Sequence, residues 1–461
     1  MPHSLSPWSF TFFLLFFTFF FLPIPTLQTT LISPVSKDKS TNLFTLSVYL
    51  KTPLRPTKLF LDLAFLFPWT LCDANYNSSS FRYVDCDRTF CFYLGFGGVS
   101  CSNCTEAGLS DPNCIPENPI CGAYPENLGD YDFDATLIDT LALPNADVST
   151  KTHLISLPNY TFSCAHSSLL KGLPKEVTGL ASLSRYNLSL PNQISSTLSV
   201  PNTFAVCFPG SSKSTGVAFF GSKGPYYAFF QNSKIDLSKS LIYTPLIVNP
   251  DGIGDTVISY SDDPPSYEYF VNLTSIRING QNVPINVSLL NIDHENFLGI
   301  GGTKFSSNTP YTLLESSIYK AFTKLFIKEA SSSRFNLTRT SSVKPFSVCY
   351  AARLVKVTSI GPDVPTVELE LGGKKGVVWR IVGANSMVRV KNKKNNLDLW
   401  CLGFVDNGVN KKTSIVIGAK QLEENLMQFD IESNKLGFTS LLTSHSLKCS
   451  HFNVTDFAKN N

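Results

Sequence analysis

The chain has 461 residues, of which 43% are hydrophobic and 16% are charged, and its formal net charge at pH 7 is +3. This length is too great for one ordinary core and suits two lobes of about 200 residues each. The small net charge, without dense clusters of Lys and Arg, argues against a nucleic-acid partner. The 28 Pro and 27 Gly punctuate short runs rich in Val, Ile, Thr and Phe, which favours strands over helices.

The amino-terminal segment has the composition of a secretory signal. Residues 1–36 contain no Lys, Arg, Asp or Glu, and an apolar run extends from Trp8 to Leu22 before Pro23 and Pro25. A run of about 15 residues is typical of the apolar core of a signal peptide and is short for a membrane span. We therefore expect a signal peptide over residues 1–27, secretion, and no stable membrane span after cleavage. A retained anchor is the alternative.

The first half of the chain shows strand patterns on both sides of a cysteine-rich segment. Alternating or short apolar runs predict strands over residues 43–50, 57–63, 69–72, 135–143 and 153–164, and a helix near 188–198. The segment 73–127 is rich in Cys, Asn, Ser and Gly and poor in periodic apolar residues, so we expect a long loop held by its own disulfides.

Cysteines are concentrated in that segment. The chain has 12, an even number, which in a secreted protein predicts six disulfides. The pair Cys101-x-x-Cys104 has a spacing found in zinc sites, but no second close pair or His-x-His follows it. We therefore expect a disulfide-held loop, no metal and no cofactor.

The second half of the chain shows the same kind of strand patterns as the first. Strands are predicted over residues 241–247, 268–278, 283–292, 377–404 and 415–438, with a hairpin turn at Asn279-Gly280. The clearest helix is predicted over 316–330, where Ile318, Phe322 and Phe326 share one face. Residues 221–233 show neither the apolar spacing of a helix nor that of a strand. The predicted domains are thus an N-terminal lobe at 28–232, with a disulfide-rich insertion at 72–121, and a C-terminal lobe at 233–461. The helix near 188–198 could be the counterpart of the helix at 316–330.

Asn-x-Ser/Thr sequons are spread over the chain, and in a secreted protein we expect some of them to carry glycans on surface loops. They begin at Asn77, Asn103, Asn159, Asn187, Asn272, Asn286, Asn336 and Asn453.

Ordered motifs give the chain a resemblance to pepsin-like aspartic proteases. The segment from Ser414-Ile-Val-Ile-Gly418 to Gly437-Phe438 resembles their closing segment, and the segment beginning Val177-Thr-Gly179 resembles the equivalent element of the plant nepenthesin-type branch. With Leu59-Phe-Leu-Asp62 before Trp69, these matches span nearly all of residues 41–440. The resemblance implies an all-β, two-lobed fold of pseudo-twofold β-barrel lobes with a few short helices.

A closer resemblance is to the plant group of basic globulins, gamma-conglutins, the extracellular dermal glycoprotein and the xylanase and xyloglucanase inhibitors. The motifs that carry it include Ile276-Arg-Ile-Asn-Gly280, Gly301-Gly-Thr-Lys304 and Pro310-Tyr-Thr-Leu-Leu. The resemblance implies localisation to the extracellular space, apoplast or cell wall. It also implies the pairs Cys72–Cys164, Cys86–Cys91, Cys207–Cys449 and Cys349–Cys401, with Cys101, Cys104, Cys114 and Cys121 paired among themselves.

The catalytic motifs of the protease fold are degraded. An aspartic protease activates water between two carboxylates about 3 Å apart that share one proton, and each acid lies in an Asp-Thr/Ser-Gly turn. Neither turn sequence occurs here: the first position reads Asp62-Leu63-Ala64 and the second reads Ser306-Ser307-Asn308. A serine cannot act as the partner carboxylate. We therefore predict no functional catalytic residue, and we interpret Asp62 as a hydrogen-bonded turn residue, with a relic acid as the alternative.

Other catalytic motifs are missing from the sequence. It contains no Gly-x-Ser-x-Gly elbow, His-Glu-x-x-His helix or Walker loop, and the glycines at 299–302 are expected to form a turn. His153, His166 and His294 are scattered, and Glu315 is expected to cap the helix at 316–330. Only about 15 residues separate the expected signal from the first core strand, which predicts no pro-segment to mask a catalytic cleft.

Three functions fit the sequence. The first is a secreted, inactive homologue that binds extracellular proteins or peptides, resembling the inhibitors of secreted glycoside hydrolases that act on xyloglucan or xylan. In that group loops of the C-terminal lobe make the contact, and Arg380 and Arg389 are candidates here, although exposed strand-end cations are the simpler interpretation. The second is an aspartic endopeptidase, and the third is a storage or peptide-binding globulin.

Overall fold

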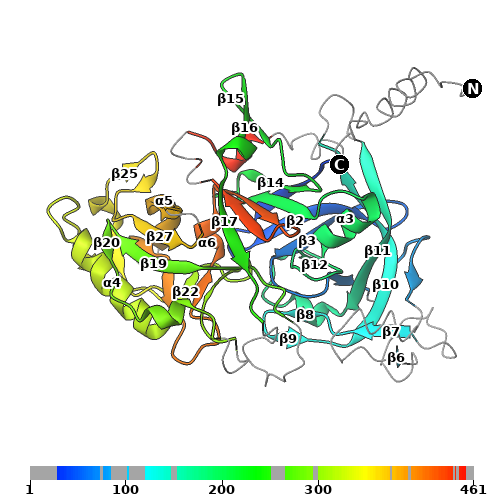
Figure 1. Cartoon of the computed structure of the whole chain (residues 1–461), viewed down its shortest axis with the longest axis horizontal. Coiled ribbons are helices and arrows are strands. Elements are labelled where there is room, and N and C mark those ends of the chain that lie inside the picture. Colours follow the sequence, from blue (N-terminus) through cyan, green and yellow to red (C-terminus); the bar gives the residue numbers. More distant parts are fainter. Residues whose placement is uncertain are drawn as a thin grey trace, which may run out of the picture.

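The computed structural model describes residues 29–72, 76–84, 101–102, 120–146, 153–250, 265–293, 299–373, 376–392, 396–439, 442 and 446–452. The expected signal peptide and most of the cysteine-rich insertion lie outside these residues. The first half of the chain forms one side of the molecule and residues from about 270 onward form most of the other (Figure 1).

Strands dominate the first half. In chain order its elements are β1 (Leu31–Lys37), β2 (Phe44–Leu50), β3 (Arg55–Asp62), β4 (Trp69–Leu71), β5 (Arg82–Tyr83), β6 (Cys101–Ser102), β7 (Ile120–Ala123), β8 (Glu126–Asn127), β9 (Asp130–Tyr131), β10 (Asp134–Pro144), β11 (Leu154–Ala165), η1 (Ser167–Leu170), β12 (Gly179–Ser182), α3 (Leu190–Leu198), β13 (Thr203–Cys207) and β14 (Thr215–Phe220).

The second half is built in the same way. Its elements are β15 (Tyr227–Phe230), β16 (Ser233–Asp236), η2 (Leu237–Ser240), β17 (Ile242–Ile247), β18 (Phe270–Val271), β19 (Leu273–Ile278), β20 (Gln281–Asn282), η3 (Val287–Leu290), β21 (Thr303–Phe305), β22 (Thr312–Leu314), α4 (Ser316–Ala330), β23 (Arg339–Thr340), β24 (Cys349–Ala351), η4 (Ala352–Leu354), β25 (Val357–Thr358), β26 (Gly361–Pro362), β27 (Val367–Leu371), β28 (Val378–Ile381), α5 (Gly383–Ser386), β29 (Met387–Asn392), β30 (Leu397–Leu402), β31 (Phe404–Asp406), β32 (Ile415–Ile417), α6 (Ala419–Leu422), β33 (Leu426–Asp430), β34 (Lys435–Phe438) and η6 (Cys449–His451).

Six neighbouring strands of one large sheet join the two halves. The antiparallel order is β1, β14, β13, β33, β34 and β17, so strands from both ends of the chain lie next to one another. Phe204 of β13 and Phe429 of β33 are fully buried and stack with their ring centroids 4.8 Å apart. This aromatic packing across the shared sheet fixes one half against the other.

Each half contains the same arrangement of four strands, which is the pseudo-twofold that the resemblance implied. In the first half β3 and β12 are parallel, β12 and β4 antiparallel, and β4 and β11 parallel. In the second half β21, β32, β22 and β31 are paired in the same order and sense. Asp62 ends β3, and Ser306 directly follows β21. The two degraded motifs therefore occupy corresponding positions.

Both predicted helices form, but they are not counterparts of one another. Helix α3 follows β12, whose equivalent β32 is followed by the short α6, whereas α4 follows β22. Our sequence-based pairing of the two helices was therefore wrong, because helical periodicity carries no information on topology. Glu315 caps α4 as predicted, since its Oε2 accepts hydrogen bonds from Ser317 N at 2.8 Å and Ile318 N at 3.3 Å.

Two further elements differ from the prediction. The segment 283–292 contains the 3-10 turn η3 and no strand, because Asn286 Oδ1 accepts the Ser288 N–H at 3.1 Å and starts a turn. Residues 221–233, which lacked a strand period, contribute β15 to a hairpin with β16. The domain boundary proposed between 232 and 233 falls in the turn of this hairpin.

Three disulfides link the described residues, and they are three of the pairs that the resemblance implied. They are Cys72–Cys164, Cys207–Cys449 and Cys349–Cys401. Cys121 is also disulfide-bonded, while Cys86, Cys91, Cys104 and Cys114 lie outside the described residues. Disulfides are typical of proteins from oxidising, extracellular compartments.

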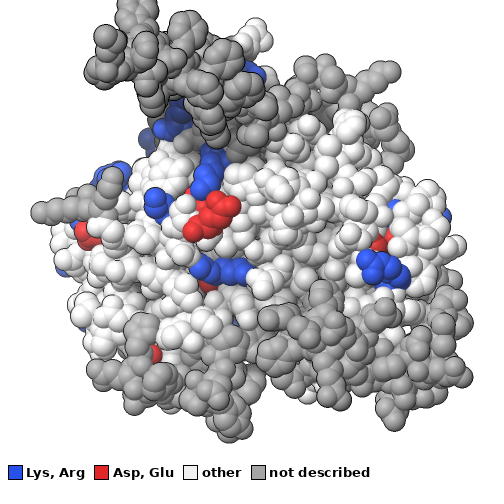
Figure 2. All heavy atoms as spheres, turned by 45° about the vertical axis from the view of Figure 1, so that its right-hand side comes forward, with Lys and Arg blue, Asp and Glu red and all other residues white. Residues whose placement is uncertain are grey.

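The face of the molecule shown in Figure 2 is mostly uncharged, with small groups in which Lys or Arg often lies beside Asp or Glu. Among the described residues, no helix is long and apolar enough to cross a membrane.

Candidate functional site

The two degraded motifs meet in the interior. Asp62 is completely buried, and Ser306 is 2% exposed. The backbone N–H of Leu63 donates a hydrogen bond to Ser307 Oγ at 3.0 Å, which joins the motifs across 244 residues of sequence. Leu63 has no side-chain hydroxyl with which to return the bond to the second motif. The first motif therefore donates to the second through its backbone but has no hydroxyl at position 63 to make a second bond.

Asp62 uses one of its carboxylate oxygens in a local turn. Its Oδ1 accepts the backbone N–H groups of Ala64 at 2.6 Å and Phe65 at 2.7 Å. Its Oδ2 is buried and has no hydrogen-bond partner. The bonds to Oδ1 support the interpretation of Asp62 as a turn residue, and Oδ2 lacks the second carboxyl with which a catalytic aspartate would share a proton.

Burial raises the pKa of Asp62 to about 6. The two backbone hydrogen bonds and the positive charge of Lys304 lower the pKa of Asp62, because they favour the charged carboxylate. The negative charge of Glu268 raises it further. Glu268 and Lys304 themselves form an ion pair at 2.9 Å and are both largely buried. Asp62 is thus neutral over more of the acidic pH range than an ordinary aspartate.

Two glutamates near this position were not found from the sequence. Burial raises the pKa of Glu126 to about 7, and the charges of Asp62 and Glu268 add to the shift. Neither glutamate forms a hydrogen bond with Asp62, whose Oδ2 has no partner. Glu126 lies in the hairpin β8–β9, and Trp69 Nε1 donates to its backbone oxygen at 2.9 Å. No local motif precedes Glu126 or Glu268, so only the folded chain brings them near Asp62.

Ser306 is occupied within its own turn. Its Oγ donates to Asn308 Oδ1 at 2.5 Å and accepts the Asn308 N–H at 3.2 Å. The position where the fold would place a second acid therefore holds a neutral hydroxyl whose hydrogen bonds are local. This arrangement offers Asp62 no second carboxylate to take up and return a proton.

The two candidate arginines of the C-terminal lobe are both paired. Arg380 Nε donates to Glu368 Oε1 at 3.2 Å. Arg389 makes a bidentate pair with Asp398, at 2.5 Å and 2.7 Å, and lies over the ring of Trp400. Both arginines lie within their strands, β28 and β29, and pair with acids of the neighbouring strands β27 and β30, so they are paired cations but do not lie at strand ends.

The other residues singled out in the sequence are scattered over the fold. His153 is exposed, His166 lies 3.7 Å from Asp134, and His294 is outside the described residues. Within the described part of the chain, no group of three His, Cys, Asp or Glu could hold a metal ion. Asn103 and Asn453 are also outside it, and the remaining sequon asparagines are all exposed: Asn77, Asn159, Asn187, Asn272, Asn286 and Asn336.

Two family models and several known proteins match the chain. Residues 44–222 match the family described as "Xylanase inhibitor N-terminal", and residues 268–440 match "Xylanase inhibitor C-terminal". The chain is 49% identical to a "Probable aspartic proteinase GIP1" of Glycine max, with 94% of each chain covered. It is 33% identical to "Gamma conglutin 1" of Prunus dulcis, covering 93% of this chain and 91% of the relative.

Solved structures show the same relationship. The structure titled "Crystal structure of edgp" matches with a TM-score of 0.82 and 38% identity, covering 93% of this chain and 99% of that chain. Basic 7S globulin from soybean matches with a TM-score of 0.73 and 29% identity, covering 92% and 98%. This chain therefore belongs to the xylanase-inhibitor-type family of pepsin-like proteins, together with the gamma conglutins and the basic 7S globulins.

Proposed function

We propose that this chain is a secreted, catalytically inactive homologue of the aspartic proteases that acts by binding, as an inhibitor of glycoside hydrolases of the xyloglucanase or xylanase type. We infer the loss of catalysis from one observation: the carboxyl of Asp62 has no second carboxyl as a partner, because the turn of the second motif holds Ser306 and Asn308. Without a second carboxylate, general acid and general base catalysis cannot alternate at a bound water. An activity lower by several powers of ten is expected.

The inhibitory role draws its support from the family descriptions. Both halves of the chain match families described as xylanase inhibitor domains. Extracellular location is supported by the disulfides and by the exposed sequons. We place the signal peptide at residues 1–27 and the boundary between the lobes near residue 232.

A titration of enzyme activity tests the inhibitory role. Purified protein is added in increasing amounts to a xyloglucan-specific endoglucanase and to a xylanase, each at fixed concentration. A saturable loss of activity at near-equal molar amounts of at least one enzyme is expected. Full activity of both enzymes at a large excess of the protein would refute this role.

An endopeptidase is the second candidate, because a relative at 49% identity is named a probable aspartic proteinase. It predicts cleavage of a denatured substrate at acid pH that pepstatin blocks. The lone Asp62 argues against it. A storage or peptide-binding globulin is the third, since gamma conglutin and basic 7S globulin are relatives, and it predicts high abundance in seed tissue.

A further inference from the structure

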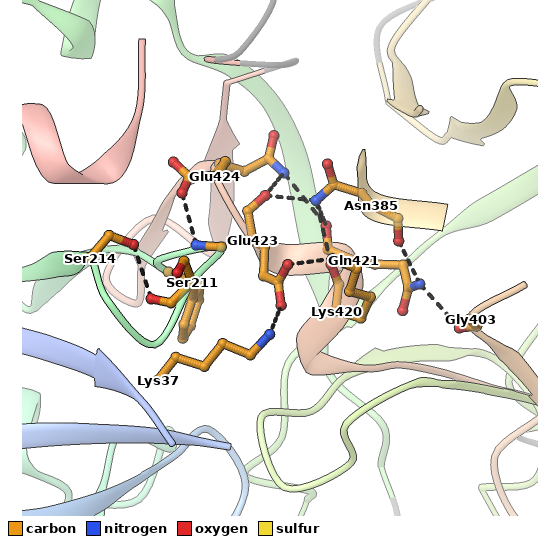
Figure 3. Close-up of polar contacts among 12 residues, drawn as sticks. Lys37, Ser211, Ser214, Asn385, Gly403, Lys420, Gln421, Glu423 and Glu424 are labelled. Carbon is orange, nitrogen blue, oxygen red and sulfur yellow. Dashed lines mark hydrogen bonds and ion pairs between the residues drawn. The ribbon is translucent and has the colours of Figure 1, made fainter. Parts of the chain in front are cut away.

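A second polar centre lies where the two ends of the chain meet, and the degraded catalytic motif does not contribute to it. Lys37 ends β1, whereas Lys420 lies in α6 and Glu423 directly follows α6. The carboxylate of Glu423 lies between the two ammonium groups (Figure 3). Its Oε1 pairs with Lys37 Nζ, and its Oε2 pairs with Lys420 Nζ at 2.6 Å. The first of these pairs spans 386 residues of sequence.

These three side chains are largely buried. Glu423 is 4% exposed, Lys37 11% and Lys420 17%. One carboxylate therefore serves two buried ammonium groups, which leaves one positive charge without a partner in the triad. The nearby carboxylate of Asp38 is engaged by Ser40 and Thr41 in its own turn. Burial and the charge of Lys420 lower the pKa of Lys37 despite the pairing with Glu423, which is the electrostatic cost of this arrangement.

The triad lines a pocket of about 400 Å³ that has aromatic walls. Tyr311 and Trp400 supply the walls, and Arg389 lies over the Trp400 ring at 4.9 Å from its centroid. Small-molecule sites typically range from about 300 to 1,000 Å³ and combine apolar or aromatic walls with a few placed polar groups. A pocket at the lower end of that range suits a single ring with one charged substituent.

We propose that this pocket is a binding site for a small carboxylate carried on a ring, with the carboxylate neutralising the surplus charge of Lys37 and Lys420 and the ring packed against Tyr311 and Trp400. The charge requirement follows from two ammonium groups sharing Glu423. The ring follows from the aromatic walls and from the pocket's size. Because the pocket takes residues from both ends of the chain, a bound ligand also links the two halves.

Calorimetric titration with three probes tests the proposal. The probes are 4-hydroxycinnamate, its neutral methyl ester and galacturonate, which carries the carboxylate on a sugar ring. At least one of the two acids is expected to bind, and 4-hydroxycinnamate, if it binds, at least about tenfold more tightly than its ester, as charge-assisted bonds require. Tighter binding of galacturonate would identify the ring as a sugar. Equal binding of 4-hydroxycinnamate and its ester, or no binding of either acid, would overturn the proposal.

Four variants locate the site. Lys420→Met leaves Lys37 and Glu423 as a one-to-one pair and should weaken binding of the acid at least about tenfold. Lys420→Arg keeps the positive charge and should therefore still bind the acid. Lys320→Met, at an exposed position of α4, is the matched control and should bind like the parent. Glu423→Gln should lower the Tm without ligand and enlarge the Tm gain on adding the acid. Unchanged binding in Lys420→Met would place the ligand elsewhere.

Discussion

The backbone N–H of Leu63 donates to Ser307 Oγ at 3.0 Å, and this bond connects the turn after β3 with the turn after β21. In a catalytic pair of Asp-Thr/Ser-Gly turns, each turn carries a hydroxyl that can bond across the dyad. Here the second turn keeps its hydroxyl while the first has lost it to Leu63. The bond joins two turns at corresponding positions of the two halves, and only the first of these turns carries an acid, Asp62.

Restoring one acid should not restore catalysis. In Ser306→Asp the new carboxylate would face Asp62 in a buried site, while Leu63 would still stand in place of the hydroxyl residue of a catalytic turn and Ala64 in place of its glycine. We expect no pepstatin-sensitive cleavage of denatured casein at acid pH. We also expect a lower Tm at neutral pH than in the uncharged control Ser306→Asn, because two buried carboxylates repel. Efficient cleavage by Ser306→Asp would show that the missing acid is the only defect.

Asp62→Asn should stabilise the protein at neutral pH. The buried carboxyl has its pKa raised to about 6, against about 3.9 in an unfolded chain, so the folded protein holds this proton more tightly. The stability contributed by the group is full below about pH 4 and is lost as the pH rises through about 6. The asparagine Oδ1 can still accept the N–H groups of Ala64 and Phe65.

Urea unfolding of the parent and Asp62→Asn at pH 4 and pH 7 measures this effect. A gain of up to about 3 kcal/mol is expected at pH 7 and little difference at pH 4. A variant that is less stable than the parent at pH 7 would show that Asp62 is held in its charged form.

Gln421 should be a structural centre of the C-terminal lobe. Its buried amide donates to Asn385 O and Gly403 O at 3.0 Å and 3.1 Å (Figure 3). It also accepts hydrogen bonds from Thr312 N at 3.1 Å and from Thr312 Oγ1 at 2.6 Å. Gln421→Leu would leave these groups unpaired, so we expect a loss of at least about 3 kcal/mol in the free energy of unfolding. Gln281→Leu, at an exposed site, is the control, and equal effects of the two changes would contradict this role.

The disulfide Cys207–Cys449 should contribute more stability than Cys349–Cys401. The first closes a sequence separation of 242 residues and the second one of 52, and closing a longer loop removes more entropy from the unfolded chain. Paired Cys→Ala replacements at each site should lower the free energy of unfolding by about 2–4 kcal/mol, with the larger loss at Cys207–Cys449. A larger loss at Cys349–Cys401 would point to residual structure in the unfolded chain.

The features that could be predicted from the sequence are those that a local residue pattern marks. Asp62 and Ser306 could be placed because each lies in a recognisable segment at a fixed distance from other motifs, and the helix at 316–330 followed from its apolar spacing. Glu126 and Glu268 were missed because nothing in their neighbourhood marks them, and Lys37 and Glu423 meet only because β1 and α6 converge in the fold. The strand expected at 283–292 failed because the Asn286 side chain starts a turn, an interaction that apolar alternation does not register.

The most direct test of the central claim compares cleavage and binding in one preparation of the purified protein. The protein is incubated with denatured casein between pH 3 and pH 6, with and without pepstatin, and is then titrated into a xyloglucan-specific endoglucanase and into a xylanase. We predict no pepstatin-sensitive cleavage and saturable inhibition of at least one hydrolase. Pepstatin-sensitive cleavage by the unmodified chain would contradict the account, because it would require a second acid to act with Asp62.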